Sequence, residues 1–477
     1  MLVERRELRR HDWAWLGSEV DAASLSGDPG EREFLKEWIA LDCPFVVARG
    51  STATRVNLGV TRPGPGPRSR VGITVALSQL TRTMPPLSLE QVGSLVPHQW
   101  RGLVDGLREL SLDHQVDIRV YGSLALQYFS PWPCINPDSD LDILLELAPD
   151  QAEWPLLAAL EVLQERHPHV RMDGEVRSGE WAVSWRELLQ ARRQRHLVLA
   201  RSDQTVALRD PALSHATGRL AVRALYRELQ LYPKPGLVSP GDRGAHEDMD
   251  ARLFLRSLFG LRHYFVRMAR AGANHASFAH LQHLGRQAED LMQKATGGVN
   301  THRGAIFHLG LLVAARGWWP HADPATLCAF VGHHWGKAIM ADHQEPLDSH
   351  GHHMARRFGL GGARQQAASG FPVIMEHGLP AWKRVFLATG DVRRSSLEAL
   401  FAMMAALDDT NLVWRGGLEG LHFVQGESAR FLFQGGVLGS DWEARILHIH
   451  RQMKQRRLSP GGSADLLAAL FFLMSLS

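Results

Sequence analysis

The hydrophobic pattern of the chain changes character close to residue 211, and this change limits the folds open to it. Before residue 211, short runs of β-forming residues alternate with helical segments. After it, such runs fade, and helical segments follow one another between glycine-rich turns. The predicted strands are 44–49, 71–77, 117–122, 141–147, 169–176 and 197–201, and the predicted helices are 214–230, 247–271, 276–295, 302–316, 324–341, 395–407 and 464–476.

We therefore expect a multidomain protein with an α+β part followed by an all-α part. A chain of 477 residues is long enough for two or three domains. The turn-rich stretch 61–70 lies between two early strands and indicates a small β subdomain. The expected boundaries are 1–85 for this subdomain, 86–211 for a mixed-sheet domain and 212–477 for the helical domain.

Composition excludes several classes of protein. The net charge is only +3, which gives no whole-protein case for nucleic-acid binding. The three cysteines form no CxxC pair, so neither a disulfide framework nor a cysteine zinc site is indicated. The longest apolar run, 466–476, is too short to cross a bilayer and predicts a buried terminal helix. Without an apolar signal segment near residue 1, we expect a cytoplasmic protein that binds no membrane.

Carboxylates in the first half suggest a metal site. Gly122-Ser123 follows a predicted strand, and Asp140 and Asp142 open the strand 141–147. Residues i and i+2 of a strand share a face, so these two carboxylates project together, as do Asp173 and Glu175 on 169–176. Paired carboxylates are costly unless a cation lies between them, and Gly122-Ser123 offers backbone N–H groups and a hydroxyl to a phosphate.

This arrangement resembles the nucleotidyltransferase superfamily, in which Gly-Ser is followed by Asp-x-Asp and by a further Asp on a neighbouring strand. The resemblance implies that two metal ions, Mg²⁺ or Mn²⁺, activate a hydroxyl and stabilise departing diphosphate at Asp140, Asp142 and Asp173. More narrowly, region 44–211 is similar to the malonate decarboxylase holo-acyl-carrier-protein synthase family, through PFVVAR, GSLALQ, SDLDILLEL and the strand at 171–173. Members attach a phosphoribosyl-dephospho-coenzyme A arm to a serine of the carrier protein.

In the second half, segment 234–250 (KPGLVSPGDRGAHEDMD) combines cations, a histidine and carboxylates around two Pro-Gly turns. Such a mixture suits a polyphosphate and a metal ion better than a structural loop. Lys234 is one of only six lysines in the chain and is therefore a candidate phosphate contact, together with Arg243. Asp248 and Asp250 are candidate ligands of a divalent cation.

Other glycine-rich motifs follow in the same half. In GGVNTHRG (297–304), Asn300 or Thr301 suits a helix N-cap, and His302 and Arg303 at a helix start would be explained by a bound anion. The remaining motifs are Ser349-His350-Gly351, GLGGARQQAASGFP (359–372), DDTNL (408–412), RGGLEG (415–420) and LSPGGSAD (458–465).

Region 214–477 resembles the triphosphoribosyl-dephospho-coenzyme A synthases at each of these motifs, in the same order. That family transfers the triphosphoribosyl group of ATP to the 2′-hydroxyl of 3′-dephospho-coenzyme A and releases adenine. The resemblance implies ATP as a substrate, with Mg²⁺ or Mn²⁺. Breaking the bond at C1′ builds oxocarbenium character, which a carboxylate stabilises, while cations hold the triphosphate.

These requirements assign a role to each candidate. Asp248 and Asp250, with Asp408 and Asp409, take the metal and ribose side, and the sequence does not decide which of Asp408 and Asp409 binds metal. His246 either protonates leaving adenine or orients a carboxylate, and orientation is the favoured role. The candidate phosphate and substrate contacts of this half are Lys234, Arg243, Asn300, Thr301, His302, Arg303, Asn411, Arg415, Ser459 and Ser463.

Together the motifs predict a fused bifunctional enzyme whose second half makes what its first half consumes. The expected partners are ATP, 3′-dephospho-coenzyme A and the apo acyl carrier protein of malonate decarboxylase, with citrate lyase as the second choice. In one alternative the first half is catalytically silent and docks the carrier; in another it adenylylates a different protein.

Two further features carry weaker expectations. The histidines between His333 and His353 are more typical of a surface than of structural zinc. The basic run 192–196 is either a solvated helix end or a contact for an acidic carrier protein. Trp13, Trp15 and Trp38 are predicted core residues.

Overall fold

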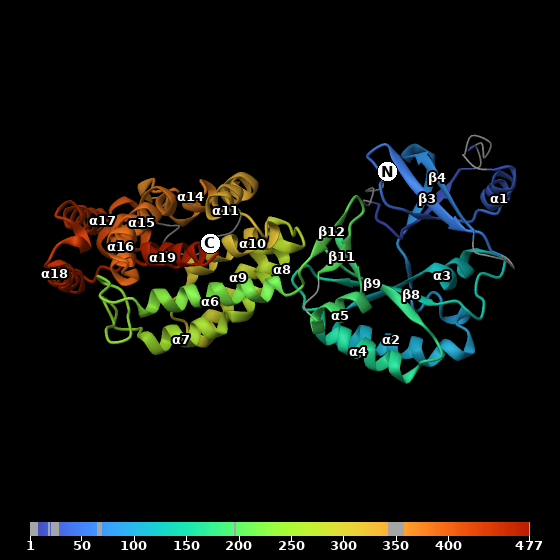
Figure 1. Cartoon of the computed structure of the whole chain (residues 1–477), viewed down its shortest axis with the longest axis horizontal. Coiled ribbons are helices and arrows are strands. Elements are labelled where there is room, and N and C mark those ends of the chain that lie inside the picture. Colours follow the sequence, from blue (N-terminus) through green and yellow to red (C-terminus); the bar gives the residue numbers. More distant parts are fainter. Residues whose placement is uncertain are drawn as a thin grey trace. The chain divides into compact units, whose positions relative to one another are not determined.

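The computed structural model describes residues 8–17, 20, 28–63, 69–194, 197–341 and 357–476. The chain divides into two compact units, Met1–Ala212 and Leu213–Ser477. The first unit contains both β-sheets, whereas helices dominate the second (Figure 1). The predicted multidomain arrangement, with sheets in the first half and helices in the second, is therefore confirmed.

A small antiparallel sheet begins the first unit, with strand order β4-β3-β2-β1-β5. Asp28 caps α1 (Pro29–Ala40) by accepting a hydrogen bond from the backbone N–H of Glu31. Trp13, Trp15 and Trp38 are buried in the core, as predicted. The strands are β1 (Trp13–Leu16), β2 (Phe45–Val47), β3 (Arg55–Thr61), β4 (Arg70–Ala76) and β5 (Leu80–Met84).

A larger sheet follows, with strand order β12-β11-β10-β9-β8-β7-β6. Among the described strands of this sheet, β8 and β9 are the one parallel pair, joined through α4 (Trp154–Arg166). Helices α2 (Arg101–His114), α4 and α5 (Trp185–Gln194) lie together on one side of it (Figure 1). The strands are β6 (Leu87–Ser88), β7 (Asp117–Tyr121), β8 (Leu141–Leu147), β9 (Met172–Ser178), β10 (Trp181–Ser184), β11 (Val198–Arg201) and β12 (Val206–Arg209).

The parallel pair decides where the candidate carboxylates lie. Because β8 and β9 run in the same direction, their first residues lie at the same edge of the sheet. Asp142 of β8 is directly opposite Asp173 of β9, and on the other side it is opposite Tyr121 at the end of β7. The β7 strand leads directly into α3 (Gly122–Phe129), so the Gly-Ser motif is at a strand-to-helix junction beside Asp142.

The second unit is built around two apolar helices, α10 (Arg303–Trp318) and α19 (Gly461–Met474). Figure 1 shows α19 inside the unit, between α16 (Val392–Ala406) and α10. Glycines let α10 approach α8 (Arg262–Ala273) closely, because a Cβ at Gly317 would overlap with the carbonyl oxygen of Ala269. The run 466–476, predicted as a buried terminal helix, falls largely within α19, which is buried along most of its length.

The other helices surround this pair. Several short helical turns, two of them π-helical, connect the longer elements. None of the helices in the described residues is long and apolar enough to cross a membrane. The elements are α6 (Leu213–Gln230), α7 (Ala251–Gly260), α9 (Phe278–Thr296), α11 (Pro324–Phe330), η5 (Val331–Trp335), α12 (Gly336–Ala341), α14 (Gly362–Ala368), η6 (Val373–Gly378), α15 (Leu379–Thr389), α17 (Thr410–Phe433) and α18 (Trp442–Gln455).

Candidate active sites

The Gly-Ser junction of the first unit depends on a glycine. Gly122 has φ 69°, a left-handed conformation that favours glycine. A Cβ at this position would also overlap with Oδ2 of Asp142, so the carboxylate occupies the space that a side chain would fill. The next residue, Ser123, has a buried Oγ with no hydrogen-bond partner among the described residues. A buried hydroxyl without a partner is costly, and a ligand oxygen would satisfy it.

The three predicted carboxylates of this unit lie at one edge of the sheet. Asp142 and Asp173 are opposite each other on parallel strands, whereas Asp140 precedes β8, with its Oδ2 3.9 Å from Nε of Arg171. In the described part of the chain, no three carboxylate, imidazole or thiolate groups are gathered as a preformed metal site. The chemistry of Asp142 and Asp173 nevertheless fits a divalent cation, because like charges side by side favour one between them.

Two partners of a neighbouring carboxylate, Glu175, escaped the sequence analysis. Glu175, which shares a strand face with Asp173, forms an ion pair with Arg10, and His11 Nε2 lies 3.3 Å from Oε2 of Glu175. The His11 ring also packs on Tyr121, with ring centroids 4.1 Å apart. Arg10 and His11 are distant in sequence from the strand motifs, so no local pattern could have identified them.

The ionisation of this group follows from burial and charge. Burial alone would raise the pKa of Glu175, but the hydrogen bond from His11 and the charge of Arg10 lower it to about 2. Burial lowers the pKa of His11, so its imidazole is neutral at neutral pH. Burial raises the pKa of Tyr121, and the negative charges of Glu175, Asp142 and Asp173 act in the same direction. Tyr121 is thus a neutral donor beside the carboxylates.

In the second unit, the structure places Lys234 away from solvent. Its ammonium group is buried, pairs with the Glu228 carboxylate and donates a hydrogen bond of 2.6 Å to the Glu228 carbonyl oxygen. Burial lowers the pKa of Lys234, and the Glu228 charge opposes that shift. This pairing favours a structural role over the triphosphate contact suggested by the scarcity of lysine.

The rest of segment 234–250 is held against α18. The backbone N–H of Gly236 donates to Nδ1 of His450 over 3.3 Å. Nε2 of His450 lies 3.0 Å from Asp242, and Lys454 donates to the same carboxylate over 3.1 Å. The predicted site included none of these residues, although Asp242 belongs to the segment 234–250 that the sequence analysis singled out. Their contacts hold the loop against α18.

His246 connects three of the motifs. Its Nε2 lies 2.8 Å from Oγ of Ser459, and its Nδ1 lies 2.9 Å from a guanidinium nitrogen of Arg415. Burial, together with the positive charge of Arg415, lowers the pKa of His246 to about 4 despite Asp248 at 3.7 Å. The imidazole is therefore neutral at pH 7, so it has no additional proton to donate to leaving adenine. This favours an orienting role, and the group oriented is the Arg415 guanidinium, which lies closer to His246 than the Asp248 carboxylate does.

The two adjacent aspartates of DDTNL differ sharply in exposure. Asp409 is buried and caps α17, where its carboxylate accepts backbone hydrogen bonds of 3.0 Å from both Asn411 and Ser463. Burial raises the pKa of Asp409, and these hydrogen bonds oppose the shift. Asp408 is exposed. The geometry therefore makes Asp409 the anchor of the motif on α19 and leaves Asp408 accessible to a metal or to substrate.

The GGVNTHRG motif also satisfies its own polar groups. The side-chain oxygen of Asn300 accepts from the backbone N–H of Arg303 over 3.1 Å, and the Arg303 guanidinium donates to Glu289 over 2.7 Å. Nδ1 of His302 lies 2.7 Å from Ser257 and 3.1 Å from Thr301. Burial and the Lys234 charge lower the pKa of His302 to about 3. The helix start thus carries no unpaired positive charge that would require an anion.

The four carboxylates predicted to bind metal in this unit are not gathered at one point. Asp250 caps α7 by accepting from the backbone N–H of Leu253 over 2.9 Å, and the Arg243 guanidinium lies 3.6 Å away. That backbone hydrogen bond and the Arg243 charge lower the pKa of Asp250. Asp248 is largely exposed and lies on the His246 side. The exposed members of the predicted site in this unit are Arg243, Asp248, Asn300, Asp408, Asn411 and Arg415.

The sequence analysis missed two carboxylates of this unit, Asp465 and Glu228. Asp465 lies against Gly304, where a Cβ would overlap with its Oδ2, so the GGVNTHRG and LSPGGSAD motifs meet there. Burial raises the pKa of Asp465 well above its usual range, and the charges of Glu228 and Asp409 act in the same direction. Its place at the start of an apolar helix was the one signal available in the sequence. Glu228 gave no comparable signal.

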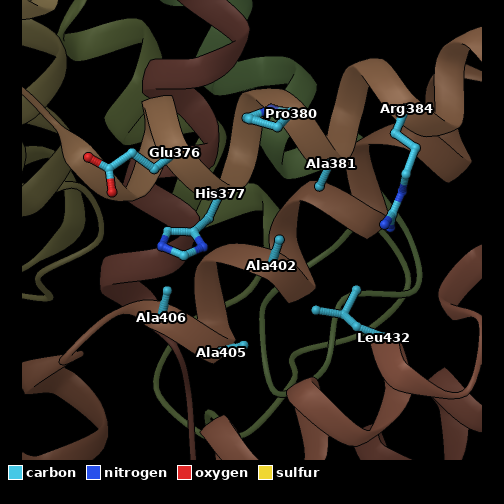
Figure 2. Close-up of a pocket in the computed structure, with 9 residues that line it drawn as sticks. All are labelled: Glu376, His377, Pro380, Ala381, Arg384, Ala402, Ala405, Ala406 and Leu432. Carbon is cyan, nitrogen blue, oxygen red and sulfur yellow. The ribbon is translucent and has the colours of Figure 1, made fainter.

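A groove of about 390 Å³ lies in the helical unit. Figure 2 shows residues that line it. Ala402, Ala405 and Ala406 of α16 form part of its lining, and the polar side chains of Glu376, His377 and Arg384 project from the helices across from them (Figure 2). Ala406 lies two residues before Asp408, so the groove begins beside the DDTNL motif. A substrate bound at Asp408 would have this concave surface next to it.

Some predicted residues lie outside the described part of the chain. They are Ser349, His350, Gly351, His352 and His353, together with Arg195 and His196 of the basic run. Within that run, Arg193 donates to Glu161 over 2.6 Å, as expected for a solvated helix end.

The helical unit should lose stability in acid because His302 is held neutral. Between its folded pKa of about 3 and its unfolded value of about 6.5, the unfolded chain binds the extra proton, so stability falls as the pH falls. Asp409 and Asp465, with raised pKa values, act oppositely. We expect His302→Gln to shrink the loss between pH 7 and pH 5 by about 2 kcal/mol in urea unfolding. Exposed His422→Gln is the control, and an unchanged loss in His302→Gln would contradict the assignment.

Three family models match the chain. The model described as ATP:dephospho-CoA triphosphoribosyl transferase matches residues 214–477. The N-terminal and C-terminal domains of the phosphoribosyl-dephospho-CoA transferase MdcG match residues 9–86 and 87–212. These matches, with motifs that converge within each unit, define a multidomain transferase.

Curated relatives agree with the first of these matches. A probable 2-(5″-triphosphoribosyl)-3′-dephosphocoenzyme-A synthase of Acinetobacter calcoaceticus is 40% identical over 259 residues, which is 54% of this chain and 89% of that protein. The 2-(5″-triphosphoribosyl)-3′-dephosphocoenzyme-A synthase of Klebsiella pneumoniae is 41% identical over 267 residues, or 53% and 87%. No solved structure matches the chain. The chain belongs to the ATP:dephospho-CoA triphosphoribosyl transferase family and carries both MdcG domains in its first unit.

Proposed function

We propose that this chain makes a prosthetic group and attaches it to a carrier protein. The helical unit joins ATP and 3′-dephospho-coenzyme A into 2′-(5″-triphosphoribosyl)-3′-dephospho-coenzyme A and releases adenine. The α+β unit transfers the phosphoribosyl-dephospho-coenzyme A part to a carrier serine and releases diphosphate. The observation that carries this proposal is that one chain matches two transferase families. By their descriptions, the family matched by the α+β unit uses the type of product that the family matched by the helical unit makes.

In the helical unit, the 2′-hydroxyl oxygen of dephospho-coenzyme A forms a bond to C1′ of the ATP ribose. The C1′–N9 bond breaks, adenine leaves with the bonding electrons and takes up a proton, and the proton lost from the 2′-hydroxyl balances it. Asp250 and Asp248 are the proposed carboxylates near the positive charge that develops at C1′. Arg415, held by His246, and Arg243 are the proposed triphosphate contacts, because guanidinium groups bind phosphate in bidentate fashion. Mg²⁺ bound with Asp408 would neutralise charge on the triphosphate.

In the first unit, the carrier serine oxygen forms a bond to the innermost phosphorus of the triphosphate. The bond from that phosphorus to the bridging oxygen breaks, and diphosphate leaves with the electrons. Asp142 or Asp173 is the proposed acceptor of the serine proton, and the Gly122-Ser123 junction is the proposed contact for phosphate oxygens. Mg²⁺ or Mn²⁺ held by Asp142 and Asp173, with Asp140 beside them, would stabilise the departing charge. A nucleotidyltransferase-like fold for this unit is part of the proposal.

The proposed carrier is the apo acyl carrier protein of malonate decarboxylase. The Gly-Ser and SDLD motifs support this choice over citrate lyase, as does the match of both MdcG domains. Nucleic acid and membrane are not part of the proposed reaction, since every substrate named above is a nucleotide or a carrier protein.

The proposal is tested with the full chain, ATP, dephospho-coenzyme A, Mg²⁺ and the apo carrier in one mixture. We expect equimolar adenine by chromatography and a gain of one phosphoribosyl-dephospho-coenzyme A in the intact mass of the carrier. Apo carriers of malonate decarboxylase and citrate lyase are compared, and faster loading of the first is expected. Adenine release without a gain in carrier mass would show that the first unit only docks the carrier. A gain of one AMP would instead identify an adenylylating enzyme.

A further inference from the structure

A cavity of about 540 Å³ lies within the first unit, and both sheets contribute to its wall. The small sheet supplies Val46, Leu58, Gly59 and Gly72, and the large sheet supplies Glu175 and Arg201. Its size falls in the range of small-molecule sites, about 300 to 1,000 Å³. The PFVVAR run supplies part of the lining, but none of the site residues predicted from the sequence lies in it.

The cavity is strongly basic. Arg10, Arg49, Arg70 and Arg201 line it, and Glu175 is the one carboxylate in its lining. Arg10 already pairs with Glu175, so that carboxylate does not neutralise the other three. Within the described part of the chain, no ion pair with a carboxylate is recorded for Arg49, Arg70 or Arg201. Several unpaired guanidinium groups around one cavity favour a bound anion.

The wall of the cavity is shaped for close approach. Gly59 of β3 and Gly72 of β4 are direct partners in the sheet, and both line the cavity. Neither glycine has a positive φ, so the backbone conformation does not require them. These glycines instead leave room in the cavity, because two paired glycines expose the sheet backbone where side chains would otherwise project. A Cβ at Gly59 would lie 3.4 Å from Nε of Arg70, which places this guanidinium beside the exposed backbone.

The cavity adjoins the carboxylates proposed for catalysis. Glu175 follows Asp173 by two residues on β9, about 7 Å along the strand on the same face. His11 of the cavity wall packs on Tyr121, which is opposite Asp142. An anion in the cavity would therefore lie within the length of one nucleotide from Asp142 and Asp173. A single substrate could occupy both places.

We propose that this cavity binds the diphosphate of the dephospho-coenzyme A half of the substrate, through Arg49, Arg70 and Arg201. The inference rests on the proposed function, in which the substrate carries a triphosphate and a diphosphate. The triphosphate must lie at Asp142 and Asp173, where diphosphate is released. The arginine-lined cavity is therefore left for the diphosphate of the dephospho-coenzyme A half. The small sheet then acts as the part of the transferase that holds its nucleotide.

Binding is measured on the full chain by hydrogen exchange, because local protection separates this cavity from the helical unit. Dephospho-coenzyme A is expected to slow exchange in peptides 44–49, 55–62 and 69–76, whereas AMP, which has no diphosphate, is not. Arg49→Gln combined with Arg70→Gln should remove this protection, while Arg55→Gln, an exposed arginine of β3 outside the cavity lining, should keep it. No protection by dephospho-coenzyme A in the wild-type chain would overturn the proposal. Protection by inorganic diphosphate alone would also overturn it and would assign the cavity to the released diphosphate.

A kinetic measurement separates this inference from the proposed function. With the triphosphoribosyl compound supplied directly, the double variant should raise KM for it about tenfold or more and change kcat far less. Unchanged KM would contradict the inference even if carrier loading were normal. Conversely, if dephospho-coenzyme A protects the cavity peptides but no carrier is loaded, the proposed binding site stands and the proposed transfer reaction is refuted.

Discussion

Replacing Asp142 with Asn is expected to stop carrier loading while adenine release continues at the wild-type rate. Asp142 lies between Tyr121 and Asp173 in the sheet, and its carboxylate fills the space that Gly122 leaves open. Asn has nearly the same shape, so the packing at this junction should survive. The change removes the negative charge that would accept the serine proton or hold a cation, and we expect a loss of at least about 100-fold in transfer.

Both activities are measured in one reaction mixture. Intact mass gives carrier loading, and chromatography gives adenine, so continued adenine release shows that the helical unit is intact. Asp138→Asn is the matched control, because Asp138 is exposed and lies four residues before Asp142, outside the strand. Loading at the wild-type rate by Asp142→Asn would refute a catalytic role for Asp142.

The strands that the sequence predicted are those with a continuous apolar or alternating pattern. All six predicted runs contain a strand, in β2, β4, β7, β8, β9 and β11. Most of the strands that were not anticipated have five residues or fewer, but β3 has seven residues with buried Val56, Leu58 and Val60 and was overlooked despite its alternating pattern. In β1 the residues Trp13 and Trp15 were recognised as core residues but not as a strand, because four residues give too little periodicity.

Glycine was a useful end signal in one place. The pair Gly416-Gly417 was expected to lie between helices, and within α17 two helical segments meet there at a kink, because Gly417 has the non-helical φ of 64° and ψ of −168°. Glycine can adopt that conformation without strain, so the chain resumes the helix on the far side. Conversely, the segment 247–271 was expected as one helix but forms α7 and α8, with the break near Leu261.

The candidate sites show a similar limit. Strand period could predict that Asp140 and Asp142 project together, because it is a local property. That Asp173 lies on the strand beside Asp142 was implied by the resemblance to the nucleotidyltransferase superfamily, and the structure pairs the two residues. Motif spacing could not show that Lys234 is buried against Glu228 or that Arg10 pairs with Glu175, since both contacts depend on how separate elements pack. A scarce residue type in a polar segment was therefore a poor guide to exposure. The same reasoning explains why the arginine-lined cavity had no signature in the sequence.

Replacing Asp250 with Asn is expected to abolish adenine release from ATP and dephospho-coenzyme A without unfolding the helical unit. Asp250 has two separable functions, because one carboxylate oxygen caps α7 through Leu253 while the charge is partly exposed and 3.6 Å from Arg243. Asn caps helices about as well as Asp, so α7 should keep its start. The negative charge proposed to stabilise developing positive charge at C1′ is lost, which we expect to cost about 100-fold or more in rate.

The chain offers a matched control at another helix start. Asp391 caps α16 by accepting from the backbone N–H groups of Arg393 and Arg394 over 2.8 and 3.1 Å. Its side chain is 44% exposed and that of Asp250 is 38% exposed. Because Asp391→Asn makes the same chemical change in a similar cap outside the synthase motifs, it should leave adenine release unchanged. Equal melting temperatures for the two variants, with adenine release lost only in Asp250→Asn, would separate the charge of Asp250 from its cap. Retained adenine release in Asp250→Asn would remove this residue from the proposed reaction and leave Asp248 as the other carboxylate proposed near C1′ to test.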